Sequence, residues 1–488
     1  MKLQAARSTR TEVIVRLLLF PALFVLSTCE VFAGETFDPF GTDSLLPPKP
    51  ALRMADTAAD PCAAQPLAHA LNLQEVVNRA LCNNPQTRVA WANSLVQAAR
   101  VGVGRSAYLP SVSLNAADNR SSGTNPGVIQ RSVGVTFSYL LYDFGARSAS
   151  LENSRQLLDA AIATQDSTVQ SVFLAAVGDY YQVQANSAAL NAALESERAA
   201  KESYDAAAAR YKIGSATPAD KLQAQTAYSQ ATLNRITADG NLRNAQGTLA
   251  NMIGLDANRS VELIPANTTA IPENFEGDIS ALIEQARQHR PDLQAAAAQV
   301  KAAQASADAA RAAGRPTISL TASSNRYNYS GISSNGTLVG INLSVPIFSG
   351  FNTTYQVRAA EAQVEARNAQ LEQVHLQVAL DVWTAYQNLT TATQSLRTSA
   401  VLLDSAQQSA QVALGRYKAG VGSILDVLNA QSSLASARQQ RIQATFNWNI
   451  SRATLAQAMG SLDAGLLQTL SDDHVQKTGE TSPQKTQP

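Results

Sequence analysis

Two stretches of alternating apolar and polar residues stand in the first half of the chain, at 111–117 and at 132–141. Val112, Leu114 and Ala116 alternate with polar residues in the first stretch. A period of two predicts strands of seven to ten residues with one apolar and one polar side. The second stretch carries Val133, Val135, Phe137, Tyr139 and Leu141 on its apolar side, and a similar pair in the second half carries Ile318, Leu320 and Ala322, then Val339, Ile341, Leu343, Val345 and Ile347.

Long helical patterns surround these strands. Residues 72–107 place apolar residues at helical spacing until Pro110, which ends a helix. Residues 146–213 contain no proline and one glycine, Gly178, and predict a helix on the order of 100 Å long at ~1.5 Å per residue. Its surface of Ala, Gln, Ser and Asn cannot lie in lipid, so it must cross an aqueous space. Further helices are expected at 218–254, 280–312, 352–417 and 424–459, the shorter ones stacked beside the long ones.

The second half of the sequence repeats the first at a constant offset of 206 in residue number. Pro110–Leu114 matches Pro316–Leu320, Arg210–Gly214 (RYKIG) matches Arg416–Gly420 (RYKAG), and Asp220 matches Asp426. One offset that holds without gaps indicates an internal duplication. We expect two units, each helix, strand, strand, long helix, helix, at 72–254 and 280–460, joined by a linker at 255–279.

Composition argues against several classes of function. Lys+Arg and Asp+Glu both number 38, and a nucleic-acid partner would need a basic excess. The four histidines are scattered without metal-ligand spacing, and phosphate-binding and nucleophile motifs are absent from the sequence. We therefore expect no cofactor, no metal and no enzymatic activity.

The N-terminus has the pattern of a signal peptide. A basic region is followed by an apolar run of about ten residues, Leu17–Leu26, which is too short to span a bilayer. We expect a signal peptide at 1–33, a proline-rich strap at 34–71 and a mobile polar tail within 461–488. An exported chain meets oxidising conditions, so Cys62 and Cys82 are candidates for a disulfide; two free thiols are the alternative.

The strands have the length and alternation of membrane β-strands, apolar toward lipid and polar toward a wet lumen. A small soluble sheet with one packed face is the alternative. Four strands cannot close a barrel, and open edges are costly in lipid, so several chains would share one barrel; three chains would give twelve strands. Aromatic residues cluster at the strand ends, where an interfacial girdle would lie: Tyr139, Tyr142, Phe144, Tyr327, Tyr329, Phe348 and Phe351.

The duplicated RYKxG turns, the hairpin ends at Tyr142–Gly145 and Phe348–Gly350, and the segment Ile424–Ala430 resemble the TolC family of outer-membrane channels. The type I secretion members, of the cyclolysin exit-duct kind, are favoured. The resemblance implies a homotrimer with a twelve-stranded barrel in the outer membrane, continued by a twelve-helix α-barrel of coiled coils across the periplasm. It also implies an equatorial belt at 255–279 and 460–475.

The resemblance assigns roles at the helix–turn–helix corners. In the family, two acidic residues ring the closed entrance; here they are Asp426 and Asn429, so one ring carries charge. Tyr417 and Asp220 match positions of the family's lock, while a lock arginine falls on Gly422. The alternative is structural: each Asp completes a helix capping box, and the tyrosines pack at a coil end. Adaptor docking at the tip would involve Arg210, Tyr211, Gly214, Arg416 and Gly420.

The function implied is a passive exit duct of a Gram-negative tripartite export system. Its partners would be a periplasmic membrane-fusion adaptor, an inner-membrane ABC (or proton-driven RND) transporter, and outer-membrane lipid. Type I protein secretion is favoured, partly because no convincing lipoprotein site precedes Cys29. The alternatives are the outer-membrane component of a small-molecule efflux pump and a soluble periplasmic coiled-coil scaffold.

Overall fold

The computed structural model describes residues 38–46, 70–121, 128–259, 261–265, 278–329 and 331–462. The chain divides into two units between Leu46 and Pro47. In the first, the short 3₁₀ helix η1 (Asp43–Leu45) is fastened by Asp38, whose carboxylate accepts a 2.8 Å hydrogen bond from the Asp43 backbone N–H. Hydrogen bonds of this kind stabilise the ionised form and lower the pKa of Asp38.

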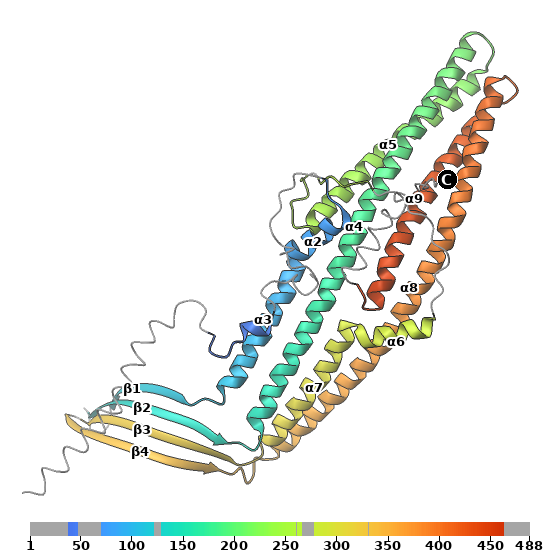
Figure 1. Ribbon diagram of the computed structural model, residues 1–488. Coiled ribbons are helices and arrows are strands. Elements are labelled where there is room, and N and C mark those ends of the chain that lie inside the picture. The colour runs from blue at the N-terminus through green and yellow to red at the C-terminus, as the bar shows by residue number, and fades with distance from the viewer. Residues whose placement is uncertain are drawn as a thin grey trace, which may run out of the picture. The chain divides into compact units, whose positions relative to one another are not determined.

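The second unit contains two sets of elements in the same order. The first set is α2 (Leu73–Asn83), α3 (Pro85–Ser106), β1 (Ser111–Ser121), β2 (Val128–Tyr142), α4 (Ala146–Lys212) and α5 (Pro218–Met252). The second is α6 (Ile279–His289), α7 (Pro291–Ala312), β3 (Thr317–Tyr329), β4 (Ile332–Ser344), α8 (Asn352–Lys418) and α9 (Ile424–Ala458). The bounds of each helix in the second set are those of its counterpart, moved by the offset of the sequence repeat. The prediction of a mixed fold with four strands per chain is confirmed (Figure 1).

Two helices expected to be continuous are broken, which corrects the expectation for 72–107 and 280–312. The breaks lie at Asn84–Pro85 and Arg290–Pro291, where the backbone of Asn84 (ψ 129°) and Arg290 (ψ 124°) is extended. Proline disfavours helical backbone at the residue before it, and it suits the first position of a new helix. Each junction therefore starts a fresh helix.

The strand bounds also differ from the expected ones. β1 continues to Ser121 and β2 starts at Val128, beyond the expected 111–117 and 132–141. β4 ends at Ser344, so Val345 and Ile347, which were expected within the strand, follow it. Polar residues at the strand ends hid the real lengths, because alternation of apolar residues stops before backbone pairing does.

The long helix α4 joins the two halves. It has 67 residues, as does α8, and so runs on the order of 100 Å. It packs against α3 and α5 of its own half and against α7 and α9 of the other half, while α8 packs against α6, α7 and α9 (Figure 1). The shorter helices thus lie beside the long ones as predicted.

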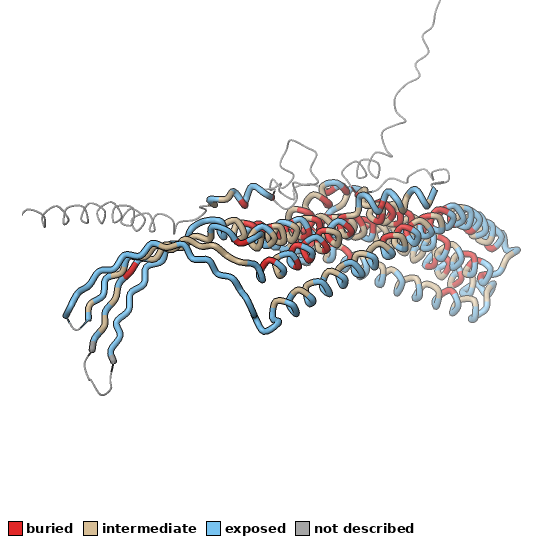
Figure 2. The backbone as a smooth tube through the Cα atoms, turned by 90° about the horizontal axis from the view of Figure 1, so that it is seen from below, coloured by how far each residue is buried: buried red, intermediate tan, exposed pale blue. Residues whose placement is uncertain are grey.

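Burial is confined to thin seams between helices. One cluster joins α2, α4 and α5 through Val76, Phe173 and Leu249, and another joins α8 and α9 through Val382 and Trp448. In Figure 2 the buried positions run along the helices, whereas the strands are mostly exposed or half-buried. The helices therefore carry the core, and the sheet is left with little packing from its own chain.

The four strands form one antiparallel sheet in the order β1-β2-β3-β4. Val112 pairs with Phe137, Phe137 with Ala322, and Ala322 with Val339, so one row of apolar residues crosses all four strands. The pairing of β2 with β3 joins the two halves of the chain. Residues directly opposite share a face, so the register fixes a single apolar face.

Candidate functional site

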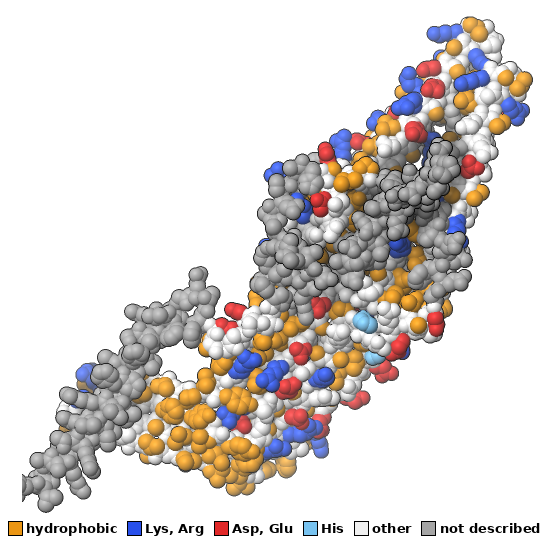
Figure 3. All heavy atoms as spheres, viewed as in Figure 1, with side chains coloured by type: hydrophobic (Ala, Val, Ile, Leu, Met, Phe, Trp, Pro, Cys, Tyr) orange, Lys and Arg blue, Asp and Glu red, His pale blue; other side chains and the backbone are white. Residues whose placement is uncertain are grey.

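The sheet presents one apolar face that is exposed in the single chain. Val112, Leu114, Val339, Ile341 and Leu343 each expose 63–70% of their surface. Figure 3 shows hydrophobic side chains gathered over the sheet. A contiguous apolar surface of this kind marks a contact with lipid or with another protein.

The other face and the far ends of the strands are polar. Thr321 and Asn342 are joined by a 2.9 Å hydrogen bond on the polar face. Toward the hairpin ends the apolar side gives way to charge: Arg131 pairs with Asp118 at 3.2 Å on neighbouring strands, and both are exposed. The apolar surface therefore ends in charged residues on the hairpin side.

The joint between β2 and α4 is a buried ion pair that the sequence analysis missed. The Arg147 guanidinium lies 3.1 Å from the Asp143 carboxylate, and their side chains are only 12% and 8% exposed. Arg147 also donates to the carbonyl of Leu140 at 2.7 Å. It therefore ties the strand end to the first turn of the helix. The i,i+4 spacing was visible in the sequence, but it lies at a turn, where helix periodicity gives no signal.

Aromatic residues flank both strand-to-helix turns. Tyr142 and Phe144 make an edge-to-face pair with ring centroids 4.7 Å apart, and Phe348 and Phe351 make another at 5.5 Å. Phe144 (φ 50°) and Phe351 (φ 63°) both have left-handed backbone, which is uncommon for a bulky residue. Such a strained backbone persists only where the surrounding structure holds it in place. Aromatic rings at the ends of the strands also suit a membrane–water interface.

Matching helix faces of the two halves differ in exposure. Ala295 and Ala302 on α7 are buried, and the backbone of Ala302 accepts a hydrogen bond from Asn153 of α4. The residues that match them on α3 are Val89 and Val96, which are 59% and 50% exposed. The larger side chains therefore lie on the exposed face of α3, and no apolar partner from the same chain covers them there.

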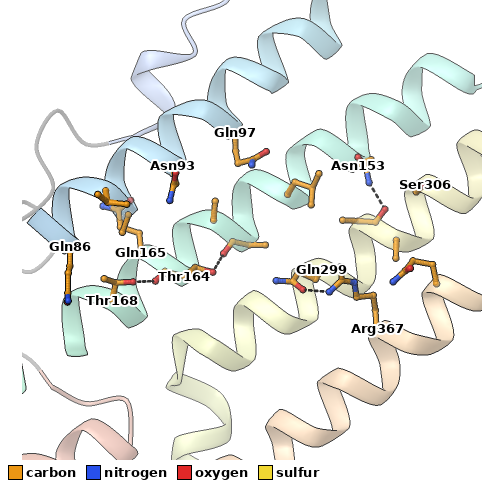
Figure 4. A pocket seen from close by; sticks show the side chains of 18 of the residues that line it. Gln86, Asn93, Gln97, Asn153, Thr164, Gln165, Thr168, Gln299, Ser306 and Arg367 are labelled. Carbon is orange, nitrogen blue, oxygen red and sulfur yellow. Dashed lines mark hydrogen bonds between the residues drawn. The ribbon is translucent and has the colours of Figure 1, made fainter. Parts of the chain in front are cut away.

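A groove of about 970 Å³ lies between α3, α4, α7 and α8. Figure 4 shows amide and hydroxyl side chains from these helices pointing toward it. Arg367 is the charged residue of its lining and is held by Gln299 and Gln370 at 3.0 and 2.8 Å. Gln165 is buried, and neither polar atom of its amide has a hydrogen-bond partner within the described part of the chain. Apart from Arg367, the groove is lined by neutral groups, and its lining holds no acid–base pair.

At the tip, where α4 turns into α5 and α8 into α9, an arginine–tyrosine contact joins the two halves beside an apolar cluster of Ala207, Ala224, Tyr417, Ile424 and Val427. The Arg210 guanidinium lies 4.2 Å from the centroid of the Tyr417 ring and donates to the Tyr417 carbonyl at 2.8 Å. Gly214 (φ +77°) and Gly420 (φ +78°) follow the helix ends; their left-handed backbone accounts for glycine in both RYKxG turns. Of the residues predicted for adaptor docking, Arg210 takes part in this contact, Gly214 and Gly420 form the two turns, and Tyr211 and Arg416 lie outside it; their role in docking stays a prediction.

The acidic residues of the tip complete two capping boxes. The backbone N–H of Asp426 donates to the Ser423 hydroxyl and its carboxylate accepts from the Ser423 N–H; Asp220 and Thr217 form the same pair of bonds. Asp426 is exposed, as is Asn429 one turn later. The cap is therefore present in both halves, and the proposed ring position of Asp426 is compatible with it.

The tyrosine of the family's lock bonds to neither acid. The Tyr417 hydroxyl is buried without a hydrogen-bond partner among the described residues. The Asp220 carboxylate accepts instead from the backbone N–H and the hydroxyl of Thr217, both at 2.9 Å. A side chain at Gly422 would come within 3.0 Å of the Arg416 Cβ and 3.1 Å of the Tyr417 backbone N. The role of these residues in a gate stays a prediction.

Several predictions fall on residues that the structure does not describe. These are the signal peptide at 1–33, residues 34–37 and 47–69 of the strap, residues 260 and 266–277 of the linker, and the tail from 463. Cys82 is disulfide-bonded, whereas Cys62, its predicted partner, lies outside the described residues, so the pairing stays a prediction.

Within the described ranges, no group of three or more metal-ligating side chains occurs. No described helix is long and apolar enough to cross a membrane.

An apolar-faced sheet carried on polar helices of this length defines a class of membrane channel whose wall extends into water. Comparison with known sequences identifies the family. Residues 76–255 and 282–461, which together make up most of the chain, match the sequence model of the outer membrane efflux protein family. The chain belongs to this family.

Individual relatives agree with this assignment. The chain is 33% identical over 382 residues to protein CyaE of Bordetella pertussis, covering 76% of this chain and 80% of CyaE. It is 26% identical over 451 residues to outer membrane protein TolC of Escherichia coli, covering 86% and 88%. The crystal structure of the outer membrane protein VceC of Vibrio cholerae superposes with a TM-score of 0.69 at 19% identity over 80% of this chain and 96% of VceC. The predictions of TolC-family membership, outer-membrane location and a channel rather than an enzyme are confirmed.

Proposed function

We propose that three copies of this chain form the outer-membrane exit duct of a tripartite export system. The observation that carries the proposal is the sheet, whose apolar face crosses all four strands while β1 and β4 remain as edges. An open edge in lipid leaves backbone groups unsatisfied at several kcal/mol each. Closure with further copies removes both edges.

The internal repeat indicates how copies join. We propose that the two halves arose by duplication, so that the pairing of β2 with β3 is repeated between β4 of one copy and β1 of the next. Phe137 pairs with Ala322 within the chain. The offset of the repeat turns this pair into Leu343 opposite Ala116 of the next copy, which keeps apolar side chains on one face.

The helices support the same arrangement. Ala160 and Ala163 of α4 are buried, whereas Ala366 and Ala369, their counterparts on α8, are exposed. Since α4 packs on α7 within the chain, α8 would pack on α3 of the next copy. That contact would cover the exposed valines of α3 and bury the apolar surface that the single chain leaves in water.

Three copies would give twelve strands and a ring of twelve helical columns, because α3 with α5 and α7 with α9 each share one column. Twelve helices spaced ~10 Å apart trace a ring roughly 38 Å across and leave about 28 Å inside after one helix diameter is subtracted. A lumen of that width admits an extended polypeptide or a small molecule.

We place the entrance of the duct at the helix–turn–helix tip. Three copies of Asp426 would form one ring of carboxylates, with the neutral Asn429 a turn further along. The tip would dock a membrane-fusion adaptor above an inner-membrane ABC transporter, which supplies the energy. An RND pump is the alternative partner.

For the cargo we favour an unfolded protein, hence type I secretion, on the resemblance to the secretion members of the TolC family. The family's description as efflux proteins favours small-molecule export as the second candidate. Co-expression with each type of pump and adaptor separates the two. Exported polypeptide in the medium supports secretion, and lowered drug susceptibility without polypeptide export supports efflux.

Single-channel recording in a planar bilayer, with native mass of the same preparation, tests the duct itself. We expect a complex of three chains and stable, cation-preferring openings. A well-folded single chain that never conducts would contradict the proposal and favour the coiled-coil scaffold.

A further inference from the structure

The tip contact between Arg210 and Tyr417 crosses from one half of the chain to the other. Besides lying over the ring, the guanidinium donates to the carbonyls of Tyr417 and Lys418, at 2.8 and 3.5 Å. These carbonyls belong to the last turn of α8, where carbonyls lack donors from within the helix and favour a positive charge; that of Tyr417 also accepts from the backbone N–H of Gly420, at 3.1 Å. Arg210 therefore closes the end of α8 while stacking on its last aromatic residue.

The matching residues of the two halves have no such contact. The counterpart of Arg210 is Arg416, which is exposed and whose guanidinium has no hydrogen-bond or ion-pair partner among the described residues, although its carbonyl accepts from the backbone N–H of Val421. The counterpart of Tyr417 is Tyr211, which is 42% exposed, whereas Tyr417 is 6% exposed. Both halves thus carry the same two residue types, but within one chain only one clasp can form, from α4 to α8.

The surroundings of the two rings also correspond. Tyr417 packs in a cluster with Val427 of α9. The residue that matches Val427 in the first half is Lys221, whose ammonium lies 5.6 Å from the centroid of the Tyr211 ring. Tyr211 therefore already has its neighbour from the following helix and lacks the arginine.

We infer that Arg416 of one copy forms the missing clasp with Tyr211 of a neighbouring copy, stacking on its ring and donating to the last carbonyls of α4. The inference rests on the proposed ring of copies, and it follows from the repeat that relates Arg210–Tyr417 to Arg416–Tyr211. Three clasps within chains would alternate with three between chains around the tip.

The two kinds of clasp differ in strength because of Lys221. In the clasp within the chain an apolar valine lies beside the ring, whereas between chains an ammonium does, and two cations at one ring repel each other. The clasp between chains is therefore the weaker and the more salt-sensitive one. The tip would open along the boundaries between copies before it opens within them.

Paired cysteines test the inference. The double variant Arg416→Cys, Tyr211→Cys is treated with a short bifunctional thiol linker in the assembled protein, and the matched control is Arg210→Cys, Tyr417→Cys. We expect the first pair to link chains into dimers and trimers on a denaturing gel, and the control pair to link only within single chains. The protein without added cysteines gives the background.

The native mass of the same samples tests the ring of copies independently of the clasp. Three-chain complexes in which the first pair links nothing, or links only within chains, would overturn the clasp and leave the ring standing. A single-chain mass would overturn the ring and the clasp with it. If the cysteine variants fail to fold, a photo-crosslinking phenylalanine analogue at position 211 replaces them, and linkage to a second chain at or beside Arg416 is the supporting result; linkage confined to the same chain overturns the inference.

Discussion

Asn84 and Arg290 occupy the same helix junction in the two halves of the chain, but they bind different elements. The Asn84 side-chain amide donates to the Met252 carbonyl at the end of α5, at 3.3 Å. Arg290 instead donates to Asp381 in the middle of α8, at 2.8 Å, and to Asp292, at 2.6 Å. Burial alone would lower the pKa of the Arg290 guanidinium, but the bonds and charges of the two carboxylates raise it.

This ion triad should stabilise the second half of the wall. Arg290→Ala would leave two carboxylates beside each other where the arginine side chain was 15% exposed. We expect a loss of about 1–3 kcal/mol, less than for a fully buried pair because both aspartates are a third exposed. Thermal unfolding of the assembled protein measures it. Arg287→Ala removes an exposed pair with Glu284 and should cost less than about 1 kcal/mol; equal losses would contradict the assignment.

The apolar face of the sheet predicts a contrast between neighbouring residues of β4. Ile341→Lys would place a charge on the face assigned to lipid, at about 2–4 kcal/mol near the bilayer midplane. Asn342→Lys lies on the opposite face, where a charge meets water. Heat-resistant oligomer recovered from membranes should fall for the first variant and change little for the second. A similar loss for both would mean that the sheet does not separate lipid from a wet lumen.

The two capping aspartates allow the ring to be tested apart from the cap. Asp426→Ala and Asp220→Ala remove the same helix N-terminal interactions, worth roughly 0.3–1 kcal/mol each. Only Asp426→Ala should reduce cation preference and block by multivalent cations, because three such carboxylates would line the entrance. Reversal potentials under a salt gradient measure the preference. If the two variants have the same selectivity, Asp426 is a helix cap alone.

Asp179 should make the protein less stable as pH rises. One oxygen of its carboxylate is buried and has no hydrogen-bond partner in the described ranges, and burial raises the pKa of Asp179 above its ordinary value of 3.8. The folded state then binds a proton more readily than the unfolded state, so stability falls as pH rises from 3.8 through the raised value. Asp179→Asn should gain roughly 0.5–1 kcal/mol at neutral pH, after a discount for partial exposure, and nothing under strongly acidic conditions. Unfolding curves of the variant and the unmodified protein, recorded at neutral pH and under strongly acidic conditions, measure this gain.

The sequence predicted the long helices and the sheet because each has a clear period. The helix of 67 residues after Gly145 has no proline to end it, and β2 alternates over its apolar part. The junctions at Asn84 and Arg290 were missed, although both precede a proline, because the apolar pattern continues across the break. The contact between Arg210 and Tyr417 could not be predicted from the sequence, since contacts between the halves depend on how their helices pack.

The unpaired edges of the four-stranded sheet also bear on how the protein reaches its membrane. A barrel closed within one chain can insert into the bilayer before it meets partners. A single copy of this chain in lipid would instead leave the backbone groups of its two edge strands without hydrogen bonds. Insertion and association would then be one kinetic event, whose rate rises steeply with the concentration of chains waiting in water. If three copies form the ring, the bilayer would admit the completed ring and exclude every smaller assembly.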